Sequence, residues 1–503
     1  MLKVTAKDFG PIVEGTVKLK PLTIFVGPSN TGKSYMATLI YALMQAFRGP
    51  EKFSRLSTGR VYVPRNALER EAVQQSSEHI GRWINDLDYW ERESRPFHYD
   101  DLPEEIRALL FDTVLAQLRS GSVSFGREIQ RCQGEIPQLR RRSVNSSEIL
   151  IELLQEEPSL SIAMAESRRV NDNLHTQAFE CHFVGSPFDS MVFGDDLVGD
   201  LIESIEGHDR FGGDVHDAYR DFLIELIELV MTHLLKVSPP KSFYLPAARS
   251  GIAQGHRIIA SVLIRQSPFA GIQRMEVPQF SGLIADFMGH LLTIGQKRGM
   301  TTDSSLSEMT SFLEQEVVRG KIYLHESGLP YPEIYYEPYG CESVIGRFAL
   351  NQTSSMVSEL APIILFLKHL VSPGDLLILE EPESHLHPAA QRQMARAIVR
   401  LVNAGVKMLI TTHSDYFLNQ INNLLRISHA NEQWLEEHGF QKSDCLQRED
   451  VSAYLFRWDD DQGGSLIDEL TIRPDVGIDD DEFGKVVNDQ YEETMLVEGI
   501  PLK

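Results

Sequence analysis

The sequence has few cysteines and no long apolar run, and each shortage excludes a class of protein. The four cysteines among the 503 residues lie far apart and never in CxxC spacing, so neither a disulfide framework nor a zinc site is predicted. No stretch reaches the roughly 18 apolar residues of a membrane helix, and the first residues lack the apolar core of a secretory signal. We therefore expect a cytoplasmic protein with no membrane partner.

Basic side chains are also scarce. Lys and Arg number 48 against 72 Asp and Glu, which gives a formal net charge of −24. Non-specific binding of nucleic acid depends on neutralising phosphates with Lys and Arg, so nucleic acid stays open as a local partner but is not indicated by the charge. The compact basic cluster, Arg140 to Arg142, is more often a solvated helix face than a binding site.

The chain is long enough for more than one compact unit, since single cores stop growing near ~250–300 residues. β-rich runs alternate with turns near the start and return after Pro240, whereas the part between looks charged and mostly helical, for example at 146–155. Sustained heptads, which a long coiled-coil arm requires, are missing. The expected parts are a head at 1–49 and 241–425, a helical insertion at 50–240, and a C-terminal α/β extension at 426–503.

A phosphate-binding loop is predicted between the apolar run 22–26 and an apolar-striped helix, where the chain matches GxxxxGK[ST]. Glycines at both ends let the backbone approach phosphate oxygens, while Lys33 reaches the β- and γ-phosphates and the Ser34 hydroxyl binds Mg²⁺. A glycine-rich turn that matches by chance is the alternative. The residues expected to bind ATP are Gly27, Pro28, Ser29, Asn30, Thr31, Gly32, Lys33, Ser34 and Tyr35.

Two adjacent carboxylates follow the second apolar run, 376–379. Parallel sheets bind ligands at the carboxyl ends of their strands, and side chains alternate along a strand. We therefore expect Glu380 to face Mg²⁺ and Glu381 to activate the attacking water. A surface pair of glutamates at the start of a loop is the alternative.

A predicted strand at 407–411 ends in Thr412-His413-Ser414 and should form a parallel βαβ unit with 376–379. This places the imidazole of His413 at the same edge of the sheet, where it can sense the γ-phosphate. By itself, a histidine after a strand is more often a loop residue.

These elements resemble the ABC-type ATPases, which are P-loop NTPases of α/β class with a mixed sheet and flanking helices. The run EEPESHLHP from Glu380 to Pro388 resembles specifically the OLD-like branch, named from the overcoming-lysogenization-defect nucleases. The resemblance implies that 384–387 form the D-loop, which crosses between two heads, and that His413 is the switch histidine. His385 and His387 alone predict no zinc site, because an HxH without a third ligand is a weak signal.

Two further elements carry the resemblance less clearly. The candidate signature motif is NQTSSMVSE at 351–359, which lacks the glycines of the LSGG signature of ABC-type ATPases. The resemblance implies that Ser354, Ser355 and Ser358 face a γ-phosphate on the opposite protomer. An ordinary N-cap explains the same serines almost as well. In YLPAARSG at 244–251, Arg249 is expected to contact a phosphate or the Walker B segment, which is the run 376–379 with Glu380 and Glu381. The alternative is a solvated or salt-bridged arginine.

The resemblance implies a Mg²⁺-dependent ATPase that forms a head-to-head dimer or a higher homo-oligomer. OLD nucleases continue into a Toprim domain, whereas here MLVEG at 495–499 is followed only by four residues, so we expect no intrinsic nuclease. The chain resembles the stand-alone ATPase subunits of anti-phage systems such as Septu and PARIS, which hold a separately encoded effector, expected here to be a nuclease. A DNA repair or recombination ATPase of the RecF kind and, less favoured, a transporter-energising subunit are the alternatives.

Overall fold

The computed structural model describes residues 2–46, 124–134, 147–153, 160–171, 174–183, 241–266, 280–294, 304–325, 332–340, 346–473, 476–479 and 491–497, with shorter pieces at 97–98, 104, 107–108, 111, 139, 192–193 and 489. Two compact units divide the chain. Unit 1 comprises Met1–Thr5, Leu43–Arg127 and Ser146–Pro240, and unit 2 comprises Ala6–Ala42, Glu128–Asn145 and Lys241–Lys503. Residues 128–145, expected within the insertion, therefore belong to unit 2 with the head.

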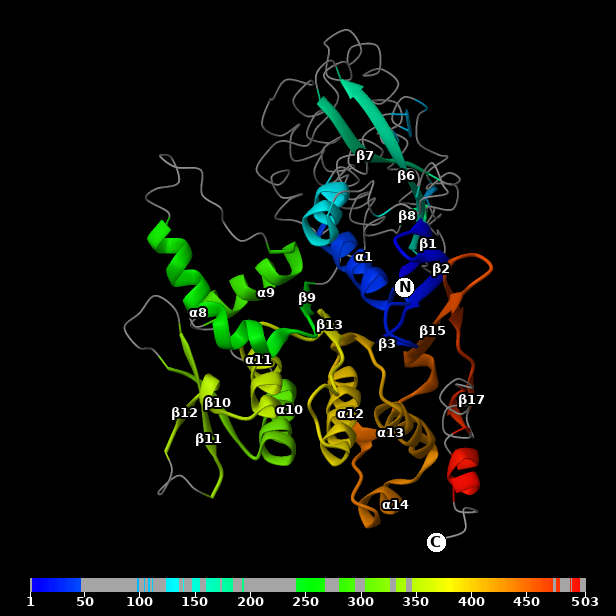
Figure 1. Ribbon diagram of the computed structural model, residues 1–503. Helices are drawn as coiled ribbons and strands as arrows, with labels where there is room; N and C mark the ends of the chain where they lie inside the picture. Colours follow the sequence, from blue (N-terminus) through cyan, green and yellow to red (C-terminus); the bar gives the residue numbers. More distant parts are fainter. Residues whose placement is uncertain are drawn as a thin grey trace, which may run out of the picture. The chain divides into compact units, whose positions relative to one another are not determined.

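Unit 2 is built on one twisted sheet (Figure 1). Successive hydrogen-bonded neighbours are β2 (Ile12–Leu19), β16 (Gly464–Glu469), β15 (Val451–Asp459), β3 (Leu22–Val26), β14 (Lys407–Thr411), β13 (Leu376–Glu380) and β9 (Ser242–Leu245), and β1 (Leu2–Phe9) lies beside β2. From β15 to β9 all strands run parallel. The predicted parallel pairing of β13 with β14 is therefore confirmed.

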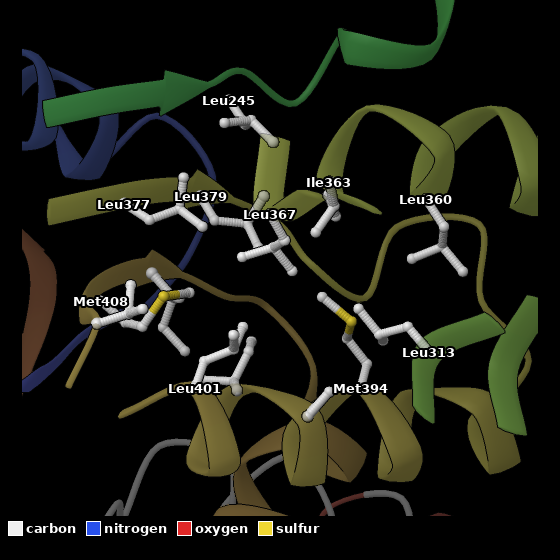
Figure 2. Close-up of a cluster of buried hydrophobic side chains, with 14 of the residues drawn as sticks. Leu245, Leu313, Leu360, Ile363, Leu367, Leu377, Leu379, Met394, Leu401 and Met408 are labelled. Atoms are coloured by element: carbon white, nitrogen blue, oxygen red, sulfur yellow. The ribbon is translucent and has the colours of Figure 1, made fainter. Parts of the chain in front are cut away.

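The strands β3, β13 and β9 are mostly apolar because both of their faces are covered. Every residue of β3, β13 and β9 is buried. Side chains alternate between the faces, so Leu377 and Leu379 enter one apolar cluster with α11 (Ser355–His369) and α12 (Pro388–Asn403), as Figure 2 shows. The opposite face receives Ile378 and the carboxylate of Glu380.

The segment expected as a C-terminal extension, 426–503, contributes two strands, β15 and β16, to the sheet of the head. β15 inserts between β3 and β16, and β16 pairs antiparallel with β15 and parallel with β2. The predicted strand at 452–458 is present, but its partner lies more than 400 positions earlier in the chain, and local pattern does not encode such a pairing.

Several helices of unit 2 begin at residues whose side chains cap them. Ser354, His387 and Ser414 cap α11, α12 and α13 (Asp415–Arg426) respectively, which satisfies amide groups that a helix end leaves unpaired. Other helices that the structure describes include α1 (Lys33–Ala46), α8 (Arg249–Gln266), α9 (Gly282–Thr293), α10 (Ser304–Phe312), the π-helix η4 (Leu313–Val318) and α14 (Glu432–Glu437), and residues 124–133 and 491–497 are also helical. Short 3₁₀ turns occur at Leu350–Gln352, Ile427–His429, Lys442–Asp444 and Arg448–Asp450.

Two small antiparallel sheets complete unit 2. One contains β10 (Gly320–His325), β11 (Glu333–Pro338) and β12 (Phe348–Ala349), and the other contains β17 (Ile472–Arg473) and β18 (Gly477–Ile478). Among the helices that the structure describes, none combines the length and the apolar character needed to cross a bilayer.

Unit 1 contains strands where helix was expected. β5 (Glu148–Leu153), β6 (Leu160–Asn171) and β7 (Leu174–Phe183) pair antiparallel in sequence order, and β4 (Phe97–His98) pairs with β8 (Val192–Phe193). The predicted helix at 146–155 is therefore wrong. Its Glu- and Leu-rich sequence has good helix propensity, but Ile149 and Ile151 are buried at strand spacing, and pairing with β6 overrides a weak local preference. The Arg140 to Arg142 cluster lies outside the described residues.

Candidate functional site

The predicted phosphate loop connects β3 to α1 in a conformation that depends on glycine. Gly27 and Gly32 have φ values of 127° and 94°, which L side chains rarely adopt. A Cβ atom at Gly27 would also collide with the backbone carbonyl of Phe456, and one at Gly32 would lie 2.9 Å from Pro11. Thr31 closes the loop by donating to the carbonyl of Pro28 at 2.8 Å.

Lys33 is held inside this loop. Its ammonium donates to the carbonyls of Gly27 and Pro28 at 2.8 and 2.6 Å, and the residue is only 5% exposed. Burial lowers the pKa of Lys33 from 10.5 to about 8, opposed by the charges of three glutamates, Glu381, Glu383 and Glu380. The lysine of the first motif and the carboxylates of the second therefore lie within electrostatic reach of one another.

The low pKa of Lys33 predicts that ATP binding weakens above pH 8. The free protein loses the ammonium charge there, whereas bound phosphates favour the charged form, so the Kd for ATP should rise by up to roughly tenfold per pH unit. Isothermal titration between pH 7 and 9.5 measures this slope. Lys33→Arg is the control, because a guanidinium stays charged over the range and should give a flat profile; an equal slope in both proteins would contradict the assignment.

The other residues of the loop differ in exposure. Pro28, Ser29, Asn30 and Ser34 are exposed, so the Ser34 hydroxyl in the first turn of α1 is accessible to a ligand. Tyr35 is 38% exposed, and its ring lies over Gly10.

Glu380, the predicted magnesium carboxylate, is oriented by the neighbouring strand β9. The Tyr244 hydroxyl donates to its Oε1 at 2.8 Å, and the Ala247 amide donates to its Oε2 at 3.0 Å. Burial, together with the Glu380 charge, raises the pKa of Tyr244, so the phenol stays protonated and remains a donor. Glu380 and Ser34 offer carboxylate and hydroxyl oxygens, the donors that Mg²⁺ prefers.

Tyr244 was missed as a site residue by the sequence reasoning, although it lies in the YLPAARSG run. Nothing in the local pattern indicates that Tyr244 faces Glu380. The pairing of β9 with β13 places Tyr244 opposite Ile378, and side-chain alternation then puts Glu380 on the same face.

We expect Tyr244→Phe to raise the Mg²⁺ concentration that supports half-maximal ATP hydrolysis by roughly 10- to 100-fold, because a hydrogen bond to a charged group contributes about 1.5–3 kcal/mol. Magnesium titration of the steady-state rate measures the shift. The matched control is Tyr41→Phe, which removes a buried hydroxyl bonded to Asp286 rather than to Glu380. Equal magnesium requirements in the two variants would contradict a specific role for Tyr244.

Glu381 begins the turn after β13 in a left-handed conformation, with φ 43°. A non-glycine residue holds such a φ only when its surroundings enforce it. Here the Glu381 amide donates to the Thr411 carbonyl at 3.0 Å, and its carbonyl accepts from Arg249 at 3.0 Å. The carboxylate is 37% exposed, with Oε2 bonded to Ser384 at 3.0 Å and Oε1 3.5 Å from Nε2 of His413.

His413 therefore lies at the predicted edge of the sheet, beside the proposed water-activating carboxylate. Burial and the charge of Lys33 lower the pKa of His413, while Glu381 opposes the shift. The imidazole is consequently neutral at pH 7 and can either donate or accept a hydrogen bond. The structure thus brings Lys33, Glu380, Glu381 and His413 together.

Arg249 contacts the Walker B segment, the second of the two contacts expected for it. Its side chain is fully buried, and the guanidinium donates to the carbonyls of Glu380 at 2.6 Å and Glu381 at 3.0 Å. It also forms a 3.1 Å ion pair with Glu359. Arg249 therefore holds the turn that presents the carboxylates of Glu380 and Glu381, and its burial excludes direct contact with a phosphate in this conformation.

The three signature serines have different environments. Ser354 caps α11 by accepting from the Val357 amide, which agrees with the N-cap alternative, and both Ser354 and Ser355 are exposed. Ser358 is fully buried and bonded to Gln254 at 2.9 Å. The expectation that Ser358 faces a nucleotide is corrected, because one helical turn separates it from the exposed end of α11 and directs it inward.

The two histidines of the D-loop segment are accounted for by the fold. His387 caps α12 through Nδ1, which accepts from Ala389 at 3.3 Å, and His385 is 59% exposed, 3.8 Å from Glu359. Across the described ranges, no group of three His, Cys, Asp or Glu side chains is arranged to hold a metal ion.

Comparison with known proteins agrees with a nucleotide-hydrolysing head. The family described as AAA ATPase domain matches residues 314–418, which include Glu380, Glu381 and His413. The uncharacterized ABC transporter ATP-binding protein YfmR of Bacillus subtilis (strain 168) is 29% identical over 86 residues, 16% of this chain. The match covers only 13% of the length of YfmR.

Solved SMC heads are similar at low identity. The SMC head bound to the C-winged helix domain of ScpA is 10% identical with a TM-score of 0.38, covering 93% of this chain and 97% of that one. The SMC head domain from Thermotoga maritima is 11% identical with a TM-score of 0.34, covering 93% and 98%. The parallel order of β3, β14 and β13, with the phosphate loop and the paired glutamates at their carboxyl ends, is that of an ABC-type P-loop NTPase fold. The chain therefore has a P-loop NTPase fold, and an ATPase domain family matches its residues 314–418.

Proposed function

We propose that this chain binds Mg·ATP between the phosphate loop and the Walker B segment and hydrolyses it with Glu381 as general base. The observation that carries the proposal is the meeting of Lys33 with Glu380 and Glu381 at one edge of a parallel sheet. Release of phosphate from ATP by the purified chain, with and without Mg²⁺, tests it. Absence of Mg²⁺-dependent release would refute it.

Each residue of the proposed site has a role in hydrolysis that agrees with its surroundings. The ammonium of Lys33 donates to phosphate oxygens in place of the two loop carbonyls that it contacts now. The loop amides and the N-terminus of α1 add partial positive charge. Ser34 and Glu380 would hold Mg²⁺, which would supply charge neutralisation for the phosphates. Glu381 accepts the proton of the attacking water, since its carboxylate is accessible, and His413 orients that water or contacts the γ-phosphate. Catalysis comes mainly from positioning and electrostatic stabilisation.

A second copy of the chain completes the proposed site. Ser354 and Ser355 lie exposed at the N-terminus of a fifteen-residue helix, whose dipole favours an anion. ATP bound to one head and capped by α11 of another would join the two copies until hydrolysis separates them. ATP-dependent dimerisation in size-exclusion chromatography, absent in a Ser354→Asp/Ser355→Asp variant, would support this arrangement.

The biological role we propose is that of an ATP-dependent sensor or scaffold subunit in a prokaryotic anti-phage complex, which controls a separately encoded effector, expected to be a nuclease. The support is the resemblance of the EEPESHLHP run, Glu380 to Pro388, to stand-alone ATPase subunits of such systems. Purification of the natively expressed protein and identification of the chains bound to it tests the role. Hydrolysis stimulated by double-stranded DNA, without a bound effector, would instead favour a repair ATPase of the RecF kind.

A further inference from the structure

Glu383 is a buried carboxylate that the proposed chemistry does not use. It lies two positions after Glu381 in the loop between β13 and α12, and it is 8% exposed. Its Oε1 accepts two hydrogen bonds from the loop after the neighbouring strand, from the Thr412 hydroxyl at 2.6 Å and from the His413 amide at 2.9 Å. One carboxylate oxygen therefore ties the loop after β13 to the loop after β14.

Packing does not explain a glutamate at this position. Its other oxygen, Oε2, is buried and has no hydrogen-bond partner among the described residues, and an unpaired buried polar atom costs about 1–3 kcal/mol. Burial raises the pKa of Glu383, while the hydrogen bonds from Thr412 and His413 act in the opposite direction. A residue that is costly for stability at the edge of an active site is a candidate for a functional role.

The two bonds fix the turn that carries the imidazole of His413. The Thr412 hydroxyl, while donating to Glu383, also accepts from the Ser414 amide at 3.1 Å, and Ser414 begins α13 as its cap. Glu383 is itself anchored in the loop, since its carbonyl accepts from the Leu386 amide at 3.0 Å. Displacement of 383–387 therefore changes the position of the His413 backbone.

We propose that Glu383 is a positioning residue for hydrolysis, which acts through His413 by holding its backbone so that the imidazole lies beside Glu381. Glu383 links the loop segment 383–387 to His413, whose Nε2 lies 3.5 Å from Oε1 of Glu381. The inference rests on the proposed ATP hydrolysis.

The test compares Glu383→Ala with the wild-type protein in steady-state hydrolysis and in equilibrium binding of ATP. We expect kcat to fall roughly 10- to 100-fold, as for a catalytic group displaced by about 1 Å, while the Kd for ATP changes less than about threefold. Glu383→Gln should keep kcat within about threefold of wild type, because its amide oxygen accepts the same two hydrogen bonds. A merely structural residue would not separate kcat from binding in this way.

A double-mutant cycle with His413→Ala shows whether Glu383 acts through the imidazole. In the His413→Ala background, Glu383→Ala should reduce kcat by less than about twofold, because coupled residues are not additive. Multiplicative losses, or an unchanged kcat in folded Glu383→Ala, would overturn the proposal. If circular dichroism shows that Glu383→Ala does not fold, Thr412→Val replaces it in the cycle, with the same outcomes. A wild-type protein without Mg²⁺-dependent hydrolysis would refute the proposed function itself, whereas an active wild type with multiplicative losses overturns only the role of Glu383.

Discussion

Replacement of Lys33 by alanine is expected to raise the Kd for Mg·ATP at least about 100-fold, because removal of one partner of a buried charge pair costs about 3 kcal/mol or more. The phosphates would lose the ammonium that the Gly27 and Pro28 carbonyls hold at the mouth of the loop. Direct titration with ATP or a fluorescent analogue measures the change.

The matched control for this variant is Lys407→Ala. Lys407 is exposed and begins β14, at the end of the strand opposite to His413, so its loss should leave the Kd unchanged. Should Lys33→Ala bind Mg·ATP as tightly as Lys407→Ala, the phosphate loop would not be the nucleotide site.

Replacement of Glu381 by glutamine is expected to lower kcat by roughly 10²- to 10³-fold while leaving ATP bound, because an amide cannot accept the proton of the attacking water. The substitution is conservative, since the amide oxygen of glutamine can still accept from Ser384, as Oε2 does at 3.0 Å. Single-turnover hydrolysis and filter binding of ATP separate the chemical step from nucleotide affinity.

The same variant should accumulate the ATP-bound assembly of two heads, which size-exclusion chromatography with ATP detects. Glu436→Gln, at an exposed position of α14, is the control for the loss of one negative charge. Normal turnover by purified Glu381→Gln would refute the role of Glu381 as general base.

The roles of Lys33 and Glu381 were predicted from the sequence because the conformation of each motif depends on residues close to it in the chain. The run 22–26 is a continuous apolar strand, and Gly27 and Gly32 supply the positive φ that the loop requires. The run 376–379 is equally apolar and delivers Glu380 at the last position of β13, with Glu381 directly after it in the turn. Local pattern was sufficient in these segments because every residue needed for the interpretation lies within about ten positions.

Local pattern failed where a partner distant in the chain decides the outcome. Residues 148–153 have the composition of a helix but become β5 by pairing with β6. Ser358 was expected to face a nucleotide, yet its position one turn into α11 buries it. Arg249 was predicted to contact a phosphate or the Walker B segment, and the full burial of its side chain selected the second.

The sequence by itself thus predicted the candidate site residues, their order in the chain and the strands on which they lie. Composition, glycine positions and side-chain periodicity were sufficient for this because each depends on only a few neighbouring residues. The orientation of Glu380 by Tyr244 and the tie between Glu383 and His413 were not readable. They arise because the order β3, β14, β13, β9 brings separate loops to one edge of the sheet, and that order depends on long-range strand pairing.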